Sequence, residues 1–327
     1  MIKMADKPYD IVTLGESMVL LQPLTERIGP SAHFVPSVGG AESNVAAALA
    51  RLDLRVRWIS RLGNDPFAKI IMSALAGEGV DLSCVEKING ERTAVYFKED
   101  SLFEDPRVYY YRKESAASKW RKEHVRDVWF EDVKHLHITG ITLALGEGTR
   151  EFVVSAMKKA SERGLTVSFD PNVRTTLKDP VFWKEAIEDV LPYVDVFMPG
   201  RSEAVLLFGN QSDEALIQAG LDHGATIVTM KLGEEGSLTG SKSMLHREKG
   251  YPIRTTVDTV GAGDAYAAGF LSVMTAHKIN VDDWIPNAAK RANVMGAIAT
   301  TYKGDWEGSP LLHELNDLLE GRVMELR

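Results

Sequence analysis

The sequence contains a single cysteine, Cys84, among its 327 residues. One thiol cannot form an intrachain disulfide, and it leaves too few sulfur ligands for a cysteine-based zinc site. No stretch approaches the roughly 18 consecutive apolar residues of a membrane-spanning helix. The N-terminal residues 1–7 also lack the apolar run of a signal peptide. These absences favour a cytoplasmic protein.

Positive charge is also scarce, because 38 Lys and Arg residues stand against 46 Asp and Glu residues and give a net charge of −8. A phosphate backbone demands a basic face, so this balance argues against nucleic acid as a partner. An anionic substrate would have to be met by locally placed Arg or Lys side chains. The hydrophobic share of 44% is ordinary for a soluble enzyme and permits a core that excludes water from a cleft.

Short apolar runs alternate with amphipathic stretches along most of the chain. This order predicts an α/β fold with a mostly parallel central sheet flanked by helices on both faces. The predicted strands are Tyr9–Leu14, Val56–Leu62, His135–Thr139, Leu165–Phe169, Val194–Met198 and Thr226–Lys231. The predicted helices are Glu42–Leu52, Pro66–Glu78, Thr149–Arg163, Pro180–Val190, Ser202–Leu207, Ala262–His277, Asp283–Thr301 and Pro310–Glu320.

Two segments, at about 15–38 and 91–114, interrupt the alternation. Thr93–Lys98 and Arg107–Lys113 are typical of strands joined by the turn-prone residues 99–106. Together with strands after Leu14 they predict a small antiparallel sheet that covers a site as a lid. Because no linker or repeat separates the segments from the rest, we expect a single domain of residues 1–327 that carries the lid as insertions.

The segment Asp258-Thr259-Val260-Gly261-Ala262-Gly263-Asp264, called the glycine turn below, follows a β-rich approach at Arg254–Val257 and opens an apolar helix. The backbone N–H groups at a helix start, together with the helix dipole, favour an anion there. Small residues let a phosphate approach that backbone closely. Asp264, in the first helical turn, could accept a proton from a hydroxyl that attacks a γ-phosphate.

Other glycine-rich loops fit this segment less well. A dinucleotide-binding loop would need glycine where Tyr266 stands, and a Walker A loop would need Lys and Ser or Thr where Asp264 and Ala265 stand. A plain glycine turn with a helix-capping Asp264 stays open at this point.

A second glycine pair, in Gly39-Gly40-Ala41-Glu42-Ser43-Asn44, opens an alanine-rich helix. The pair would let a ligand approach the backbone, and Asn44 could point back to that ligand with both a donor and an acceptor. A plain helix start is the alternative, with Glu42 as a helix-start or solvated charge. His135 and His137 share one strand face, but without a third ligand in view we expect histidines of the core or of an edge strand.

These two segments together resemble the signatures of the ribokinase-like (PfkB) carbohydrate kinases, and the resemblance covers essentially the whole chain. It implies a ribokinase-like fold with a β-lid over the sugar and MgATP as the phosphoryl donor. It further implies that Asp264 is the catalytic base and that the backbone of Gly261, Ala262 and Gly263 is the anion hole. Some relatives hold a monovalent cation behind the anion hole, and the sequence leaves that cation open.

The resemblance extends to the nucleotide side. Lys231-Leu232-Gly233-Glu234-Glu235-Gly236 is similar to the family's turn beside the ATP phosphates, which implies roles for Lys231, Gly233 and Gly236. Asn293 falls near the family's adenine pocket. The family often has Asn-x-x-Glu where this chain has Gly200-Arg201-Ser202-Glu203, so Glu203 remains as an organiser of Mg²⁺-bound water while the Asn amide is missing.

Two arginines bear on the choice of sugar. Arg112 ends a lid strand and Arg174 follows the strand that ends near Phe169, where sites form in α/β folds. A guanidinium fork meets a carboxylate bidentately, as a sugar acid would require. Strand alternation places Tyr110 on the same face as Arg112, and Tyr96 on the partner strand could join them. A solvated strand end for Arg112 and a surface ion pair for Arg174 are the alternatives.

The segments around these residues resemble 2-keto-3-deoxygluconate kinases. That resemblance implies phosphorylation of the C6 hydroxyl of 2-keto-3-deoxygluconate, with substrate contacts from Gly40, Asn44, Tyr96, Tyr110, Arg112, Arg174 and Asp264. A kinase for a neutral sugar such as fructose or ribose, and a non-catalytic sugar sensor on the same scaffold, are the alternatives. Tyr109 and Tyr111 on the outer lid face favour a homo-oligomer formed through the lid.

Overall fold

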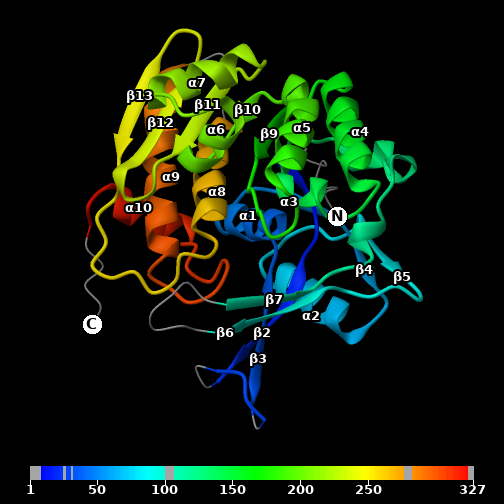
Figure 1. Ribbon diagram of the computed structural model, residues 1–327. Coiled ribbons are helices and arrows are strands. Elements are labelled where there is room, and N and C mark those ends of the chain that lie inside the picture. The colour runs from blue at the N-terminus through cyan, green and yellow to red at the C-terminus, as the bar shows by residue number, and fades with distance from the viewer. Residues whose placement is uncertain (1–8, 25–26, 31, 100–106, 276–281, 323–327) are drawn as a thin grey trace, which may run out of the picture.

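The structure is a computed structural model that describes residues 9–24, 27–30, 32–99, 107–275 and 282–322. Its described strands form a nine-stranded sheet and a four-stranded sheet (Figure 1). The order in the large sheet is β13 (Leu245–Lys249), β12 (Gly236–Gly240), β11 (Ile227–Lys231), β10 (Val196–Phe197), β9 (Thr166–Asp170), β8 (His135–Thr139), β1 (Ile11–Leu14), β4 (Val56–Gly63) and β5 (Val85–Ile88).

The large sheet is parallel from β5 to β11, and β12 and β13 continue it as an antiparallel hairpin. Every residue of β1 and β8 is buried, as expected for strands whose two faces are both covered. The helices α1 (Ala41–Arg51), α2 (Pro66–Gly77), α8 (Ala262–Met274), α9 (Ile285–Ala299) and α10 (Leu312–Leu319) contribute to one core. The helices α3 (Gly140–Leu143), α4 (Thr149–Glu162), α5 (Pro180–Val190), α6 (Arg201–Phe208) and α7 (Asp213–Asp222) contribute to the other (Figure 1). The mostly parallel α/β fold with helices on both faces is therefore confirmed.

Short 3-10 helices complete the described elements. They are η1 (Ala117–Lys119), η2 (Lys122–His124), η3 (Asp127–Phe130), η4 (Leu191–Tyr193), η5 (Gly233–Glu235) and η6 (Asp282–Trp284). None of the helices in the described part of the chain combines the length and the apolar character needed to cross a membrane.

Local signals explain why α2 and α5 begin where the sequence predicted. In each helix a proline occupies the first turn, where its missing N–H costs nothing. The Asp65 carboxylate accepts a hydrogen bond of 2.9 Å from the Ala68 N–H, and Asp179 accepts one of 2.9 Å from the Phe182 N–H. Such caps satisfy amides that the helix itself leaves unpaired.

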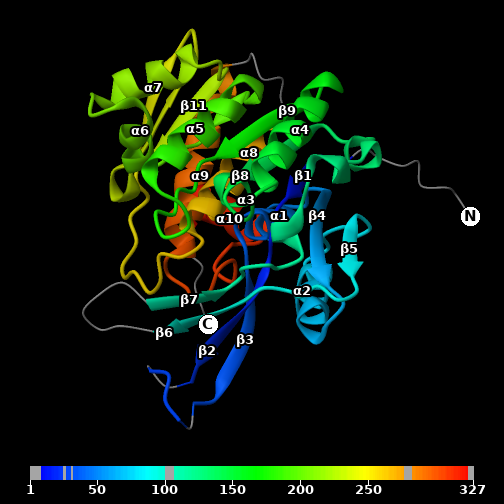
Figure 2. The same ribbon diagram turned by 45° about the vertical axis from the view of Figure 1, so that its right-hand side comes forward.

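The small sheet has the order β3 (Phe34–Gly39), β2 (Met18–Pro23), β6 (Val95–Glu99) and β7 (Arg107–Tyr111), and it projects beneath the main body in both views (Figures 1 and 2). Its outer pairs are antiparallel, but its central pair, β2 with β6, is parallel. The prediction of an all-antiparallel sheet was wrong. The reason is that β2 follows β1 and β6 follows the parallel strands β4 and β5, so both segments leave the large sheet at the same edge.

Other expectations need smaller corrections. Arg254–Val257, predicted as a β-rich approach, is not a strand. The hairpin of β12 and β13, the strand β5 and the helix α7 were not predicted. The turn expected at 99–106 lies mostly outside the described residues, as does the end of the helix predicted at Ala262–His277.

Candidate active site

Polar side chains gather where parallel strands of the large sheet end. Glu16 follows β1, Asp170 ends β9 and Lys231 ends β11. Since parallel strands end at the same edge, these residues lie along one side of the sheet. They line a cavity of about 820 Å³, here called the small-sheet cavity, whose other walls come from the small sheet and the start of α8.

A second cavity, of about 710 Å³, lies beside the first and is called here the α9 cavity. Gly233, Gly236, Ala262 and Asn293 line it, together with residues of the segment 250–256. The two cavities share three lining residues, which are Lys231, Thr259 and Gly263. A group that passes from one cavity to the other must therefore pass the start of α8.

The geometry of the glycine turn demands glycine at one position in particular. Gly261 precedes α8 with a φ of 77°, in the left-handed region that side chains disfavour. A Cβ built on Gly261 would stand 1.8 Å from the carbonyl oxygen of Asp305. The close approach of these two backbone segments therefore excludes any larger residue and fixes the start of α8.

Asp264 lies buried in the first turn of α8 and lines the small-sheet cavity. Burial raises the pKa of its carboxyl to about 8, although the hydrogen bond from Asn44 opposes this rise. The carboxylate Oδ2 accepts that bond from Asn44 Nδ2 at 2.7 Å. A carboxyl group with a pKa near the working pH is suited to accept a proton during a reaction.

Asn44 was predicted to point to a ligand, but in the structure its side chain bonds to protein groups. Its Nδ2 also donates to Asp305 Oδ2 at 3.2 Å, and its Oδ1 accepts a bond of 3.2 Å from the Gly40 N–H. Gly40 precedes α1 and lines the same cavity. Asn44 thus orients the Asp264 carboxylate from the opposite wall.

Asp305 is a site residue that sequence reasoning missed. It is buried in the small-sheet cavity and accepts a hydrogen bond of 3.1 Å from the Tyr96 hydroxyl. Burial raises the pKa of its carboxyl to about 6. The segment Gly304–Gly308 was noted for its resemblance, but only the fold brings Asp305 beside Asn44.

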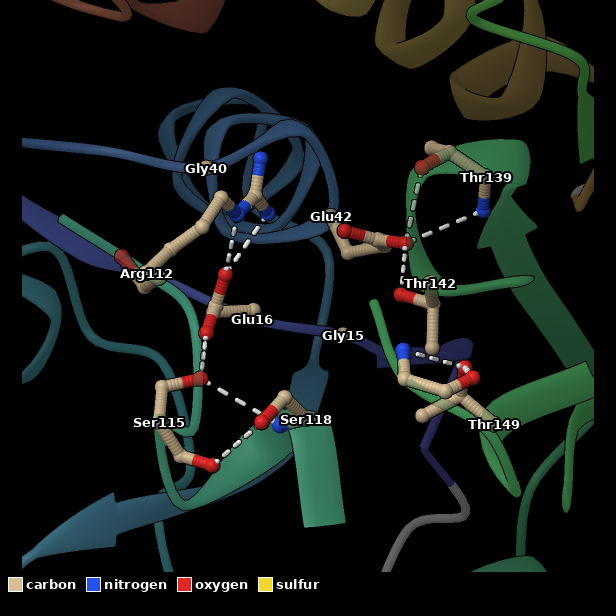
Figure 3. Close-up of polar contacts among 12 residues, drawn as sticks. Gly15, Glu16, Gly40, Glu42, Arg112, Ser115, Ser118, Thr139, Thr142 and Thr149 are labelled. Atoms are coloured by element: carbon tan, nitrogen blue, oxygen red, sulfur yellow. Dashed lines mark hydrogen bonds and ion pairs between the residues drawn. The ribbon is translucent and has the colours of Figure 1, made fainter. Parts of the chain in front are cut away.

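Arg112 lines the small-sheet cavity with Tyr110 and Tyr96, as the strand alternation predicted. The rings of Tyr96 and Tyr110 stack with centroids 5.7 Å apart, and Arg112 Cζ lies 5.6 Å from the Tyr110 centroid. Figure 3 shows what was not predicted, an ion pair between Arg112 and Glu16. Arg112 Nε and Nη2 lie 2.8 Å and 2.6 Å from Glu16 Oε2, and Ser115 donates to Oε1. The position of Glu16 directly after β1 was the available signal.

Arg174 is exposed and lines the small-sheet cavity from the loop after β9. Within the described parts of the chain it makes no ion pair, so the alternative of a surface ion pair is not observed. Glu203 holds the loop, because its Oε1 accepts a bond of 2.7 Å from the Val173 N–H while its Oε2 accepts one of 2.6 Å from the Gly200 N–H. Arg174 is therefore available to an anion in the cavity.

Lys231 stands between the two cavities, and its Nζ lies 2.5 Å from Asp170 Oδ2. Burial alone would lower the pKa of this ammonium, but the nearby carboxylates of Asp170 and Glu203 outweigh burial and raise it. Lys231 therefore stays positively charged at the junction. A Cβ built on Gly263 would be 3.6 Å from Lys231 Nζ, so this charge lies against the start of α8.

The carboxylates around Lys231 already accept hydrogen bonds from protein groups. Both Glu203 oxygens accept backbone N–H bonds, and Asp170 accepts bonds from Lys231 and from the Asn172 N–H at 3.2 Å. Among the described residues no group of three His, Cys, Asp or Glu side chains could hold a metal ion. These carboxylates therefore fit contacts to metal-bound water better than direct ligation.

Glu42 lies in the first turn of α1, as the helix-start alternative predicted. It is 0% exposed, so the other alternative, a solvated charge, is not observed. Its Oε1 accepts bonds from the Thr139 N–H, the Thr139 hydroxyl and the Thr142 hydroxyl at 3.1, 2.8 and 2.7 Å (Figure 3). Burial raises the pKa of this carboxyl to about 7. His135 and His137 are buried and bonded to Ser168, which confirms them as core residues.

Comparison with known proteins places this geometry in a family. The profile of the pfkB family carbohydrate kinases matches residues 9–311. The 2-dehydro-3-deoxygluconokinase of Bacillus subtilis (strain 168) is 37% identical over 318 residues, which are 96% of each chain. A crystal structure of a PfkB protein from Polaromonas sp. JS666 matches with a TM-score of 0.84 and 35% identity, covering 94% of this chain and 99% of its own.

A fructokinase double mutant from Vibrio cholerae O395, crystallised with fructose, ADP and a potassium ion, matches with a TM-score of 0.85 and 29% identity, covering 96% of this chain and 100% of its own. The profile and the relatives extend over nearly the whole chain, and the glycine turn and both cavities lie within the matched region. The chain belongs to the pfkB family of carbohydrate kinases.

Proposed function

We propose that this kinase transfers the γ-phosphoryl group of ATP to the C6 hydroxyl of 2-keto-3-deoxygluconate, giving 2-keto-3-deoxy-6-phosphogluconate. The observation that carries the proposal is the small-sheet cavity, which holds a buried carboxyl group, Asp264, and two arginines, Arg112 and Arg174. The similarity to a 2-dehydro-3-deoxygluconokinase supports the same substrate.

In this proposal the two arginines bind the carboxylate of the sugar acid. A guanidinium can donate two parallel bonds to a carboxylate, and such charged bonds are stronger than neutral ones. Glu16 already neutralises part of the Arg112 charge, whereas Arg174 has no carboxylate partner among the described residues. Arg174 therefore makes the larger contribution to recognition of the acid.

The reacting end of the sugar points toward Asp264, which takes the proton of the C6 hydroxyl. ATP lies in the α9 cavity with its phosphates toward the shared edge, where the backbone of Gly261, Ala262 and Gly263 and the Lys231 ammonium stabilise the transferring phosphoryl group. Bound Mg²⁺ supplies charge neutralisation on the phosphates. Glu203 and Asp170 would orient its water ligands.

A neutral-sugar kinase is the second candidate, and one observation favours it. Because Glu16 pairs with Arg112, the charge that this arginine offers to a substrate is reduced. A hydroxyl-rich sugar such as fructose would be less dependent on that charge than a sugar acid.

The two candidates differ in an ADP-release assay over 2-keto-3-deoxygluconate, fructose and ribose at fixed MgATP. We expect the sugar acid to have the highest kcat/KM, and phosphorus NMR of the product should place the phosphate on C6. Higher kcat/KM for fructose or ribose would replace the proposal with the neutral-sugar kinase. No ADP release with any sugar would favour the sensor.

Self-association through the small sheet is part of the proposal. The outer face of this sheet carries Phe34, Phe97 and Tyr111 in edge-to-face contact, and Tyr109 and Tyr111 are 44% and 64% exposed. A second copy of the sheet would cover these rings. Sedimentation at micromolar concentration should give a dimer or larger species, and Tyr111→Asp should shift it toward monomer. A monomeric wild-type protein would contradict self-association through the small sheet.

A further inference from the structure

Strand β6 of the small sheet reaches the glycine turn through one buried ion pair. Lys98 Nζ donates to Asp258 Oδ2, and the two side chains are only 4% and 6% exposed. Lys98 was not among the predicted site residues, and the proposed reaction gives it no role. We propose that Lys98 is a positioning residue, which holds the glycine turn in its phosphoryl-transfer geometry only while β6 is docked on it.

Asp258 connects Lys98 to the residues of the anion hole. Its second oxygen, Oδ1, accepts a hydrogen bond of 3.1 Å from the Val260 N–H, so the side chain shapes the residues directly before Gly261. Without Lys98 the Asp258 carboxylate would be a buried charge that has lost its counter-ion, which is strongly unfavourable. The side chain would turn toward water, and the bond that shapes the turn would be lost.

Strand β6 also contacts Asp305, the residue that packs against Gly261. Successive side chains of a strand alternate between faces, so Tyr96 and Lys98 point the same way. The Tyr96 hydroxyl donates to Asp305, whose carbonyl oxygen packs directly against Gly261. One strand therefore fixes both segments that enclose the glycine of the anion hole. Tyr96 also lines the cavity proposed for the sugar, so a sugar that steadies β6 would also steady the anion hole.

A direct contact between Lys98 and the substrate is the competing explanation, since Lys98 also lines the small-sheet cavity. The Lys98 side chain is nearly fully buried and its ammonium forms an ion pair with Asp258, whereas Arg174 is exposed. A positioning role predicts a loss in kcat, whereas a contact in the ground state predicts a rise in the KM for the sugar.

The experiment measures kcat and both KM values for Lys98→Met and Lys98→Arg. We expect Lys98→Met to lower kcat about 10- to 100-fold, with the sugar KM changed less than about 3-fold, because the loss is confined to the transition state. Lys98→Arg, which keeps the charge, should recover most of kcat. Lys134→Met is the matched control, because Lys134 pairs with Asp10 at 2.7 Å at a half-exposed site, and its kcat should stay unchanged.

A double-mutant cycle with Asp258→Asn tests the coupling itself. In the Asp258→Asn background, Lys98→Met should lower kcat by less than about 3-fold, since the partner is already lost. Additive losses, or a raised sugar KM with kcat intact, would overturn the proposal. If Lys98→Met does not fold, Lys98→Gln takes its place with the same expectations.

The inference rests on the proposed anion hole but not on the proposed sugar. If the wild-type enzyme phosphorylates another sugar better, the cycle is measured on that sugar. Failure of the proposed substrate and failure of the coupling therefore give different results.

Discussion

The α9 cavity and the small-sheet cavity differ in how many charged side chains line them. Lys231, Glu234 and Arg254 are the charged residues among those that line the first, whereas nine charged residues line the second. Backbone groups can bind phosphates in any chain that folds the same turn. Charged side chains must be placed one by one, so the small-sheet cavity is where selectivity for a sugar can arise.

The largest expected effect is a loss of kcat caused by a change at the junction of the two cavities. Asp264→Asn removes the proposed base but keeps the size of the side chain, and we expect kcat to fall by at least about 10³-fold. The affinity for ATP should be nearly unchanged, because the α9 cavity does not include Asp264. Steady-state kinetics and ATP titration check both statements. Turnover close to the wild-type rate would remove Asp264 as the base.

A second effect follows from Glu42, the buried carboxyl group in the first turn of α1. The Glu42 carboxyl has an ordinary pKa of 4.5 when unfolded and a pKa of about 7 in the folded protein. The folded state therefore holds the proton more tightly, so stability from this group is present below pH 4.5 and is lost as pH rises to 7. The loss is at most about 3 kcal/mol of unfolding free energy.

Glu42→Gln cannot ionise and should remove that loss. The unfolding free energy from urea titration at pH 5 and pH 8 should differ less in this variant than in the wild type. Glu147→Gln, at an exposed position, is the control and should follow the wild type. Parallel pH dependence in Glu42→Gln and wild type would mean that Glu42 is ionised in the folded protein.

A third prediction concerns selectivity within the small-sheet cavity. Arg174→Ala should lower kcat/KM for 2-keto-3-deoxygluconate by about 10- to 100-fold, the range expected for hydrogen bonds to a charged group. The loss for fructose should be several-fold smaller. Equal losses of kcat/KM on both sugars would show that Arg174 shapes the cavity without binding the carboxylate of the sugar acid.

The smallest expected effect is a shift in a pH profile. Because the pKa of Asp264 is raised to about 8 in the free protein, kcat/KM should rise with pH and level off near that value. The hydrogen bond from Asn44 lowers this pKa, so Asn44→Ala should move the rise toward higher pH. A shift toward lower pH would contradict the orientation of Asp264 by Asn44.

The difference between a contiguous turn and charged side chains placed one by one also explains which features the sequence could predict. The glycine turn is contiguous, so the helix start at Ala262 was predicted from its own residues. The six strands β1, β4, β8, β9, β10 and β11 of the large sheet were predicted to within a few residues, because both faces of the sheet are covered there and their apolar runs are continuous. The outer strands β5, β12 and β13 were missed. The parallel pairing of β2 with β6 was missed, since pairing direction depends on how distant strands leave the large sheet.

The missed site residues are those defined by long-range pairing. Glu16 and Arg112 are 96 positions apart, Lys98 and Asp258 are 160 apart, and Asn44 and Asp305 are 261 apart. No local pattern marks such partners. The burial of Glu42 was missed for the same reason, because the threonines that donate hydrogen bonds to it come from β8 and α3.

The most direct test of selectivity uses two substrates that differ at one carbon. 2-Keto-3-deoxygluconate and 3-deoxyfructose share every other group, but the first carries a carboxylate where the second carries a hydroxymethyl group. We expect the ratio of their kcat/KM values to be about 10² or more in favour of the acid, because two arginines contribute charged hydrogen bonds to its carboxylate. A ratio near one would contradict recognition of a sugar acid and would assign the cavity to a neutral sugar.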